Sequence, residues 1–401
     1  MRPLLRVSLR GFLENELTSA EGNVLETLAY ILALLIAGSI CVSFLFVIKY
    51  YFALGVREWE FREAVSWADK EFLISLSMAV TSFVTVLAWD SLYPGRRDCM
   101  ILTSLRVRMR SIFLARILSI LALLGCCTVA VNSFSTVVFP LMVLSERLSW
   151  SAFFAYASAH LISLSAAGCF AFSSLLALQG LLAIVLGYRQ FRWISTWVQF
   201  GVLLGILCLF FMMPDIAYRE TLADANRLRM AMWLPPFWFL GLYQSLLGSG
   251  DDSVLALARA ARLGLLAAAV AACVMYASGY VRHVRAAMEE AELEPRRASP
   301  GGAFIRNWLK RLLLRSPVQA AVFHFVARTM RRNRRHRLLL AISGTVGLAY
   351  VFEAVAALVR QDSPGYWLRP TAEAISVPQR TISSMESGTA LNFCINVPTG
   401  R

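Results

Sequence analysis

Long apolar stretches alternate with polar segments along this chain. The stretch from Leu28 to Ile48 contains no charged side chain. A helix rises about 1.5 Å per residue, so about 20 apolar residues cross the hydrocarbon core of a bilayer, which is about 30 Å thick. Hydrocarbon offers the backbone no hydrogen-bond partners, and a segment inside it therefore forms a helix. The pattern predicts an all-α polytopic membrane protein, a helical bundle of about seven transmembrane helices with interfacial amphipathic helices.

The predicted spans share a length that suffices to cross a membrane, and they lie at 27–48, 72–89, 112–143, 152–187, 193–213, 258–280 and 337–359. The third and fourth are longer than a bilayer requires. We expect these two helices to tilt, to kink or to extend beyond the membrane. Pro140 and Gly180 are the candidate break points, because proline and glycine interrupt or weaken a helix.

Polar segments divide the chain into five parts. These are an N-terminal interfacial helix (1–24), a six-helix core (25–280), a basic loop with amphipathic helices (281–336), an additional transmembrane helix (337–360) and a polar tail (361–401). In the first part, Arg2, Arg6 and Arg10 share one helix face beside an apolar face, as in helices that lie on a membrane; a frayed basic leader is the alternative. The abrupt change at the tail is also what a truncated or frameshifted gene product would give.

Composition and charge agree with a membrane protein and predict its orientation. The chain has 401 residues, of which 58% are hydrophobic and 16% charged, against about 25% charged in soluble proteins. The net charge is +14, and basic residues gather in 90–111, 188–192 and 281–336. Because basic loops stay in the cytoplasm, the N-terminus is predicted to be cytoplasmic. We assign the basic charge to membrane lipid and a protein partner, not to nucleic acid.

Motifs of known catalytic or metal sites are missing from the sequence. There is no phosphate-binding Gly-rich loop, no pair of closely spaced cysteines at metal-ligand spacing and no acid–base cluster, so no catalytic residue, metal or cofactor is predicted. His160 and Glu353 fall inside predicted spans, where ionisable groups are costly and often functional. His160 is also explained as a hydrogen-bonded histidine of the bundle, and Glu353 as a residue close to the interface.

Two segments are more specific, and a further motif that is common by chance concerns helix packing. Between the second and third spans, a Pro-Gly turn precedes a short basic helix, with residues of interest at Pro94, Arg96, Arg97, Asp98, Leu102 and Leu105. Before the sixth span, a double proline and interfacial aromatics precede an apolar helix too short to cross, marked by Pro235, Pro236, Trp238 and Gly248. Gly201 and Gly205 are spaced for close helix packing, within the bundle or between protomers.

These two segments resemble the membrane subunits of type-2 ABC exporters, over about residues 20–360. In that family, an arginine-rich cytoplasmic loop after the second span docks on a separate ATPase, and a short external re-entrant helix pair precedes the last core span. The resemblance implies that the residues from Pro94 to Leu105 contact a P-loop ATPase subunit. It also implies that the segment from Pro235 to Gly248 is re-entrant on the external side. The family often has Pro-Val at the turn where this chain has Arg106 and Val107.

The resemblance predicts a permease without its own ATPase, acting as a homodimer or with a sister permease in a bacterial cytoplasmic membrane. An ion-coupled secondary transporter that uses Glu353 and His160 is the first alternative, although few buried carboxylates are expected. A membrane enzyme acting on a lipid-linked substrate is the second. Lipid, peptide, drug and polysaccharide substrates all remain open.

Overall fold

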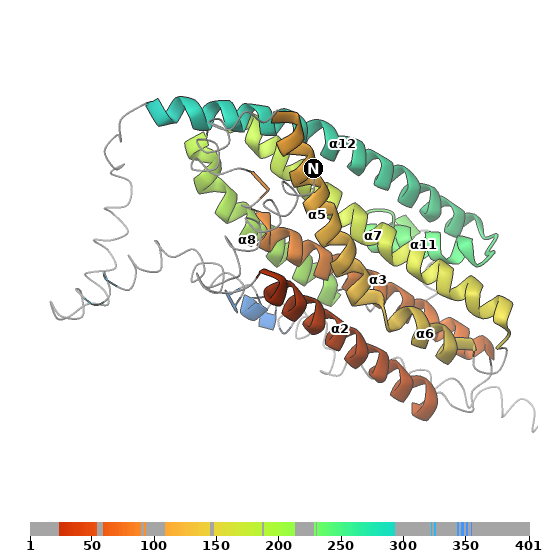
Figure 1. The fold of residues 1–401 in the computed structure, drawn as a ribbon. Coiled ribbons are helices and arrows are strands. Elements are labelled where there is room, and N and C mark those ends of the chain that lie inside the picture. The colour runs from red at the N-terminus through yellow and green to blue at the C-terminus, as the bar shows by residue number, and fades with distance from the viewer. Residues whose placement is uncertain are drawn as a thin grey trace, which may run out of the picture. The chain divides into compact units, whose positions relative to one another are not determined.

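The computed structural model describes residues 24–53, 59–89, 92–93, 109–144, 148–186, 188–212, 228–229 and 231–292, and single positions between 322 and 354. Every regular element in this part of the chain is helical. All of these helices belong to the compact unit Met1–Ala356. The elements in chain order are α2 (Val24–Ile48), the π-helical turn η1 (Lys49–Ala53), α3 (Trp59–Leu87), α5 (Met109–Asn132), α6 (Ser135–Leu144), α7 (Trp150–Val185), α8 (Tyr188–Met212), α11 (Pro235–Leu246) and α12 (Asp252–Glu292) (Figure 1).

Five stretches within the described residues are long and apolar enough to cross a membrane. They are Ala29–Tyr51, Arg62–Leu87, Phe113–Leu144, Trp150–Val185 and Asp252–His283. This confirms the prediction of an all-α membrane protein, whereas the predicted number of seven spans is not confirmed. The predicted span at 193–213 corresponds to most of α8. The apolar stretch of α8, Trp197–Phe210, is shorter than the five stretches above. Of the predicted span at 337–359, the structure describes only separate helical positions between 343 and 354.

The second membrane helix differs most from its predicted bounds. The sequence pattern places a loop before residue 72, but α3 already begins at Trp59. Charged residues in its first turns caused the difference, because a pattern read without neighbours assigns charge to water. In the structure Arg62, Asp69 and Lys70 are buried inside the bundle.

The two candidate break points are also corrected. α7 runs through Gly180 without interruption, and Gly180 instead allows α12 to approach closely. Pro140 lies inside α6, and the interruption between α5 and α6 falls before it, at Ser133 and Phe134. Here hydroxyl groups compete for helix carbonyls, as the Ser133 hydroxyl donates to the Ala130 carbonyl at 2.9 Å.

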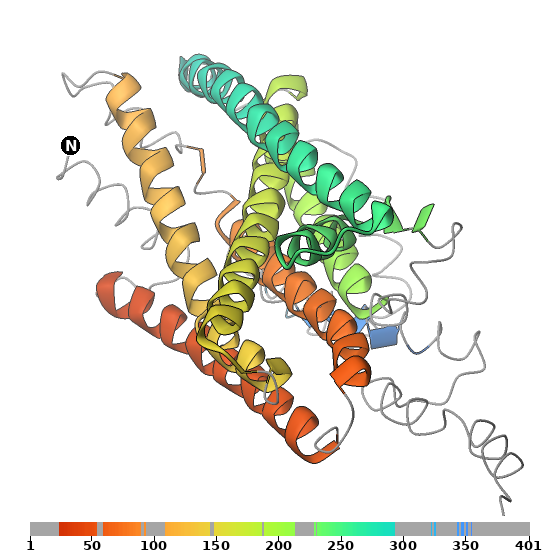
Figure 2. The same cartoon turned by 90° about the vertical axis from the view of Figure 1, so that its right-hand side faces the viewer.

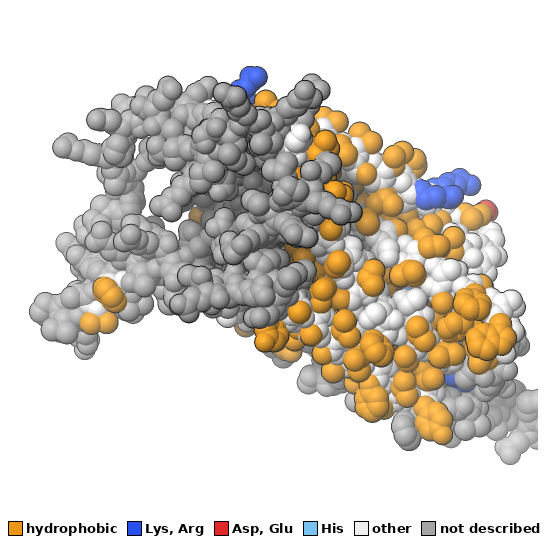
Figure 3. Space-filling view, in the orientation of Figure 1, with side chains coloured by type: hydrophobic (Ala, Val, Ile, Leu, Met, Phe, Trp, Pro, Cys, Tyr) orange, Lys and Arg blue, Asp and Glu red, His pale blue; other side chains and the backbone are white. Residues whose placement is uncertain are grey.

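The helix α7 organises the bundle. It packs against α12, α3, α11 and α6, while α2 packs against α5 and α6 (Figures 1 and 2). The outer faces of α2 and α12 carry exposed apolar side chains such as Leu34, Phe44, Leu263 and Leu266. Much of the described surface in Figure 3 is accordingly hydrophobic. An apolar outer surface of this kind is unusual for a soluble monomer and suits a helix bundle in lipid.

Candidate functional site

The short helix α11, which lies between α8 and α12 in the sequence, packs inside the bundle against α12, α7 and α3. The chain before it is already inside, because Ala231 is fully buried. Pro235 and Pro236 occupy the first helical positions, where no backbone N–H donor is needed. Gly248, with φ +92°, turns the chain toward α12 in a left-handed conformation that favours glycine. The segment predicted from the double proline is therefore a single short helix packed against α12, α7 and α3.

The depth of α11 follows from its contacts with α12. Gly241 lacks a side chain where α11 meets Leu257 and Ala258, which permits close packing of the two helices. Near the other end of α11, the Trp238 indole lies against Gly264, where a Cβ would come within 2.8 Å of the ring. Gly264 follows the start of α12 by twelve residues, which corresponds to about 18 Å along a helix. The beginning of α11 therefore lies about 18 Å along α12 from the start of that helix, and the two helices run side by side in opposite directions.

A buried lysine on α3, Lys70, faces the helix α11. Lys70 is 0% exposed, and its Nζ lies 5.4 Å from the ring centroid of Tyr156 and 5.2 Å from that of Tyr243. With its side-chain oxygen turned toward α3, Gln244 accepts hydrogen bonds from Lys70 Nζ at 3.3 Å and from Trp67 Nε1 at 3.1 Å. Within the described part of the chain, Lys70 makes no ion pair with a carboxylate. Aromatic faces and one amide contact the amine, and the charges of Glu63 and Asp69 act on it from a greater distance, which together offset part of its lost hydration.

Two acidic residues flank Lys70 and have different surroundings. Asp69 accepts from Lys49 Nζ at 2.6 Å and from the Tyr50 hydroxyl at 2.8 Å, which ties η1 to α3. Glu71 is fully buried, and the Ser75 hydroxyl donates to its Oε1. The Glu71 Oε2 atom has no hydrogen-bond partner among the described residues. An ionisable group so placed within a membrane-length helix is a candidate functional group.

A line of polar side chains continues from the Lys70 environment into the bundle. The Tyr243 hydroxyl lies 3.4 Å from His160 Nδ1, and His160 Nε2 lies 3.2 Å from Ser135 Oγ. Next to the break between α5 and α6, the Asn132 amide donates to Ser77 Oγ at 3.1 Å. Both ring nitrogens of His160 thus have partners, as the interpretation of a hydrogen-bonded bundle histidine requires. Hydroxyl and imidazole groups in such a line can also pass protons.

The residues predicted to contact an ATPase, from Pro94 to Leu105, lie outside the described residues, as does Glu353. The structure does describe Tyr93, the residue directly before Pro94, and its side chain is buried. Its ring centroid lies 5.2 Å from that of Tyr276 on α12 and 5.8 Å from that of Phe191 on α8. Burial raises the pKa of the Tyr93 hydroxyl above its usual value, so this group stays neutral at physiological pH. The start of the predicted coupling segment is therefore anchored to two membrane helices.

The predicted packing motif on α8 is open. A Cβ at Gly201 or at Gly205 would meet no heavy atom within 4 Å. Among the described residues, no other helix approaches either glycine closely, and packing between protomers stays a prediction. No disulfide joins two described cysteines, and no group of three or more potential metal-ligating side chains occurs among the residues that the structure describes.

Known proteins give no guide to this site, because no protein-family model, no curated protein and no solved structure matches the chain. Its residues are therefore the basis for a functional assignment. Sequence reasoning had missed the charged residues of α3 by placing them in a loop. One signal could have found them, since Lys70, Ser77 and Thr81 fall seven and four residues apart and share one helix face.

Proposed function

We propose that this chain is the membrane-spanning permease subunit of an ABC-type exporter, without an ATPase domain of its own. It pairs with a second copy or a sister permease and with P-loop ATPase subunits in a bacterial cytoplasmic membrane, with its N-terminus in the cytoplasm. The observation that carries the proposal is α11, a buried helix too short to cross a membrane that packs inside the bundle directly before α12. The resembled family has a re-entrant segment at this place.

The packing of α3 supports a route for coupling to ATP hydrolysis. The segment 94–108 connects the end of α3 with the start of α5, so a force on it acts on both helices. α3 also contacts α7, α8 and α11. A tilt of α3 would therefore change the surroundings of Lys70 and the packing of α11 against α3. The open face of Gly201 and Gly205 supports pairing with another permease through α8.

The test is co-purification of a P-loop ATPase from mild detergent. Replacing Arg96, Arg97 and Asp98 together by alanine should reduce recovery of the ATPase, because complementary charge raises association rate and specificity. The matched control removes Arg282 and Arg285, which are exposed near the end of α12 that packs beside Tyr93. That control should leave recovery unchanged. Absence of an ATPase from repeated preparations of the wild-type chain would contradict the proposal.

A second candidate, an ion-coupled secondary transporter, is favoured by one observation. Lys70, Glu71 and His160 are fully buried within membrane-length helices, whereas the sequence had suggested few buried charges. Cargo movement in sealed vesicles without ATP, driven by an imposed proton gradient and abolished by a protonophore, would support this candidate. Movement that requires ATP and persists with the protonophore would support the exporter.

A further inference from the structure

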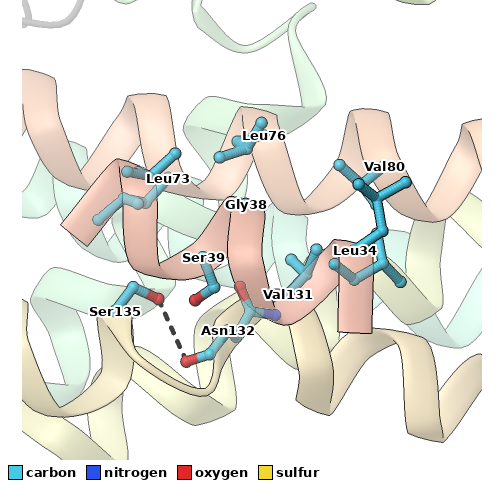
Figure 4. Close-up of a pocket in the computed structure, with 11 residues that line it drawn as sticks. Leu34, Gly38, Ser39, Leu73, Leu76, Val80, Val131, Asn132 and Ser135 are labelled. Atoms are coloured by element: carbon cyan, nitrogen blue, oxygen red, sulfur yellow. Dashed lines mark hydrogen bonds between the residues drawn. The ribbon is translucent and has the colours of Figure 1, made fainter. Parts of the chain in front are cut away.

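A cavity of about 130 Å³ lies between α2 and α3, above the break between α5 and α6 (Figure 4). α2 packs against α5 and α6, and α3 packs mainly against other helices, which leaves this space between the two. Apolar side chains form most of its walls and three small polar side chains form its floor. The residues that matter here are Leu34, Gly38 and Ser39 of α2, Leu76 of α3, and Asn132 and Ser135 at the break.

The cavity lies near the middle of the membrane-length helices around it. Gly38 is close to the centre of the stretch Ala29–Tyr51, and the break at Ser133 and Phe134 interrupts the stretch Phe113–Leu144. Interrupted helices at the bilayer midplane free backbone and side-chain polar groups for binding, and transport proteins place substrate sites there. The cavity is too large to be filled by one water molecule, whose share of liquid volume is about 30 Å³.

Hydrogen bonds fix the orientation of Asn132. Its Nδ2 donates to the Thr128 carbonyl at 2.9 Å and to Ser77 Oγ at 3.1 Å. A carbonyl can only accept, so this contact places the amide nitrogen there and turns Oδ1 toward α2, as Figure 4 shows. No described residue donates a hydrogen bond to this Oδ1. An unpaired amide oxygen therefore faces an otherwise apolar space, which is costly unless a ligand supplies a donor.

A second polar atom lies beside it on α2. Ser39 Oγ accepts from the Phe134 N–H at 3.2 Å, which leaves the hydroxyl hydrogen without an acceptor among the described residues. The cavity thus offers one acceptor, Asn132 Oδ1, and one donor, the Ser39 hydroxyl. A single alcohol group can serve both, because a hydroxyl donates one hydrogen bond and accepts two.

We propose that this cavity binds a neutral lipid-like alcohol, a hydrocarbon chain with a hydroxyl group that donates to Asn132 Oδ1 and accepts from Ser39. None of the residues that line the cavity is charged, so a charged headgroup would find no compensation there. Leu34 and Gly38 are exposed on the apolar face of α2, so the ligand enters from the lipid side. Ser135 of the cavity is linked through His160 to Tyr243 of α11 by hydrogen bonds.

The test uses the full chain in nanodiscs and does not depend on an ATPase. The probe is a long-chain primary alcohol that carries a photoreactive diazirine, and the comparison probe is the diazirine alkane of the same length. Peptide mapping by mass spectrometry should locate saturable crosslinks to 34–42, 73–80 or 131–135 for the alcohol only. An excess of unlabelled alcohol should remove them.

The key variant is Gly38→Leu, because a Cβ at this position meets no heavy atom within 4 Å and the side chain can fill the cavity without a clash. Displacing about two methylene groups of the ligand should weaken binding about tenfold. The control is Gly125→Leu, an equally open position on α5 outside the cavity, which should bind like the wild type. Uniform, unsaturable labelling of the outer helices, equal labelling by the alkane, or full binding by Gly38→Leu would each overturn the proposal.

Discussion

The crossing of α7 and α12 offers the sharpest test of the architecture. Gly180 on α7 and Gly279 on α12 face each other without side chains. A Cβ at Gly180 would lie 2.5 Å from the carbonyl carbon of Met275, and a Cβ at Gly279 would lie 2.8 Å from the carbonyl oxygen of Gly180. These obstacles are backbone atoms, which cannot turn away as a flexible side chain could. We therefore expect Gly180→Ala to push the two helices apart.

The magnitude follows from the geometry. Carbon atoms in contact lie about 3.5–4.0 Å apart, so the new methyl group is at least about 1 Å too close. Overpacking of this kind costs about 3 kcal/mol, at the upper end of the usual range, because both helices must move. The better helix propensity of alanine returns about 1 kcal/mol. The net loss in the free energy of unfolding is about 2 kcal/mol, or about 2 °C in Tm for a chain of 401 residues.

Denaturant or thermal unfolding of the purified chain in a mild detergent measures this loss. Gly125→Ala is the matched control, since a Cβ there meets open space and the variant gains only helix propensity. Gly180→Ala as stable as the wild type, beside an unchanged control, would show that α7 and α12 do not cross at these residues.

Three further predictions concern the buried lysine, the assembly and the orientation. Lys70→Met should leave the free energy of unfolding unchanged or raise it by about 1 kcal/mol, because it removes a buried amine that forms no ion pair with a described carboxylate. Transport assays of this variant should show a loss of activity. Normal transport activity would show that Lys70 is not part of the functional site. Changing Gly201 and Gly205 together to leucine should lower the dimer fraction in single-molecule photobleaching, whereas Gly125→Leu should not. A cysteine at Ser104 should resist membrane-impermeant thiol reagents in intact cells, and ready labelling relative to the wild type would reverse the predicted topology.

The local sequence pattern was sufficient to predict the class of the protein. Apolar length alone predicted membrane helices, since a helix in hydrocarbon satisfies its backbone without help from the rest of the chain. The double proline and the short apolar run likewise predicted α11 as too short to span, because proline begins a helix and length limits its reach. These are properties of neighbours in sequence, and the structure describes helices where they were expected.

Contacts between residues that are far apart in the sequence could not be predicted from the local pattern. The charges of α3 read as a loop because nothing local reveals that Tyr156, Tyr243 and Gln244, all far along the chain, surround Lys70. Gly180 read as a break because only the position of α12 shows that a side chain there has no room.

The sequence by itself thus determined that this is a helical membrane protein with a short inserted helix and no recognisable catalytic motif. The tertiary structure alone decided which polar groups are buried together. It joined His160 to Ser135 and Tyr243, and it placed Asn132 and Ser39 in the wall of one cavity. The physical reason is that hydrophobic length acts within one helix, whereas burial and hydrogen-bond pairing depend on how separate helices pack.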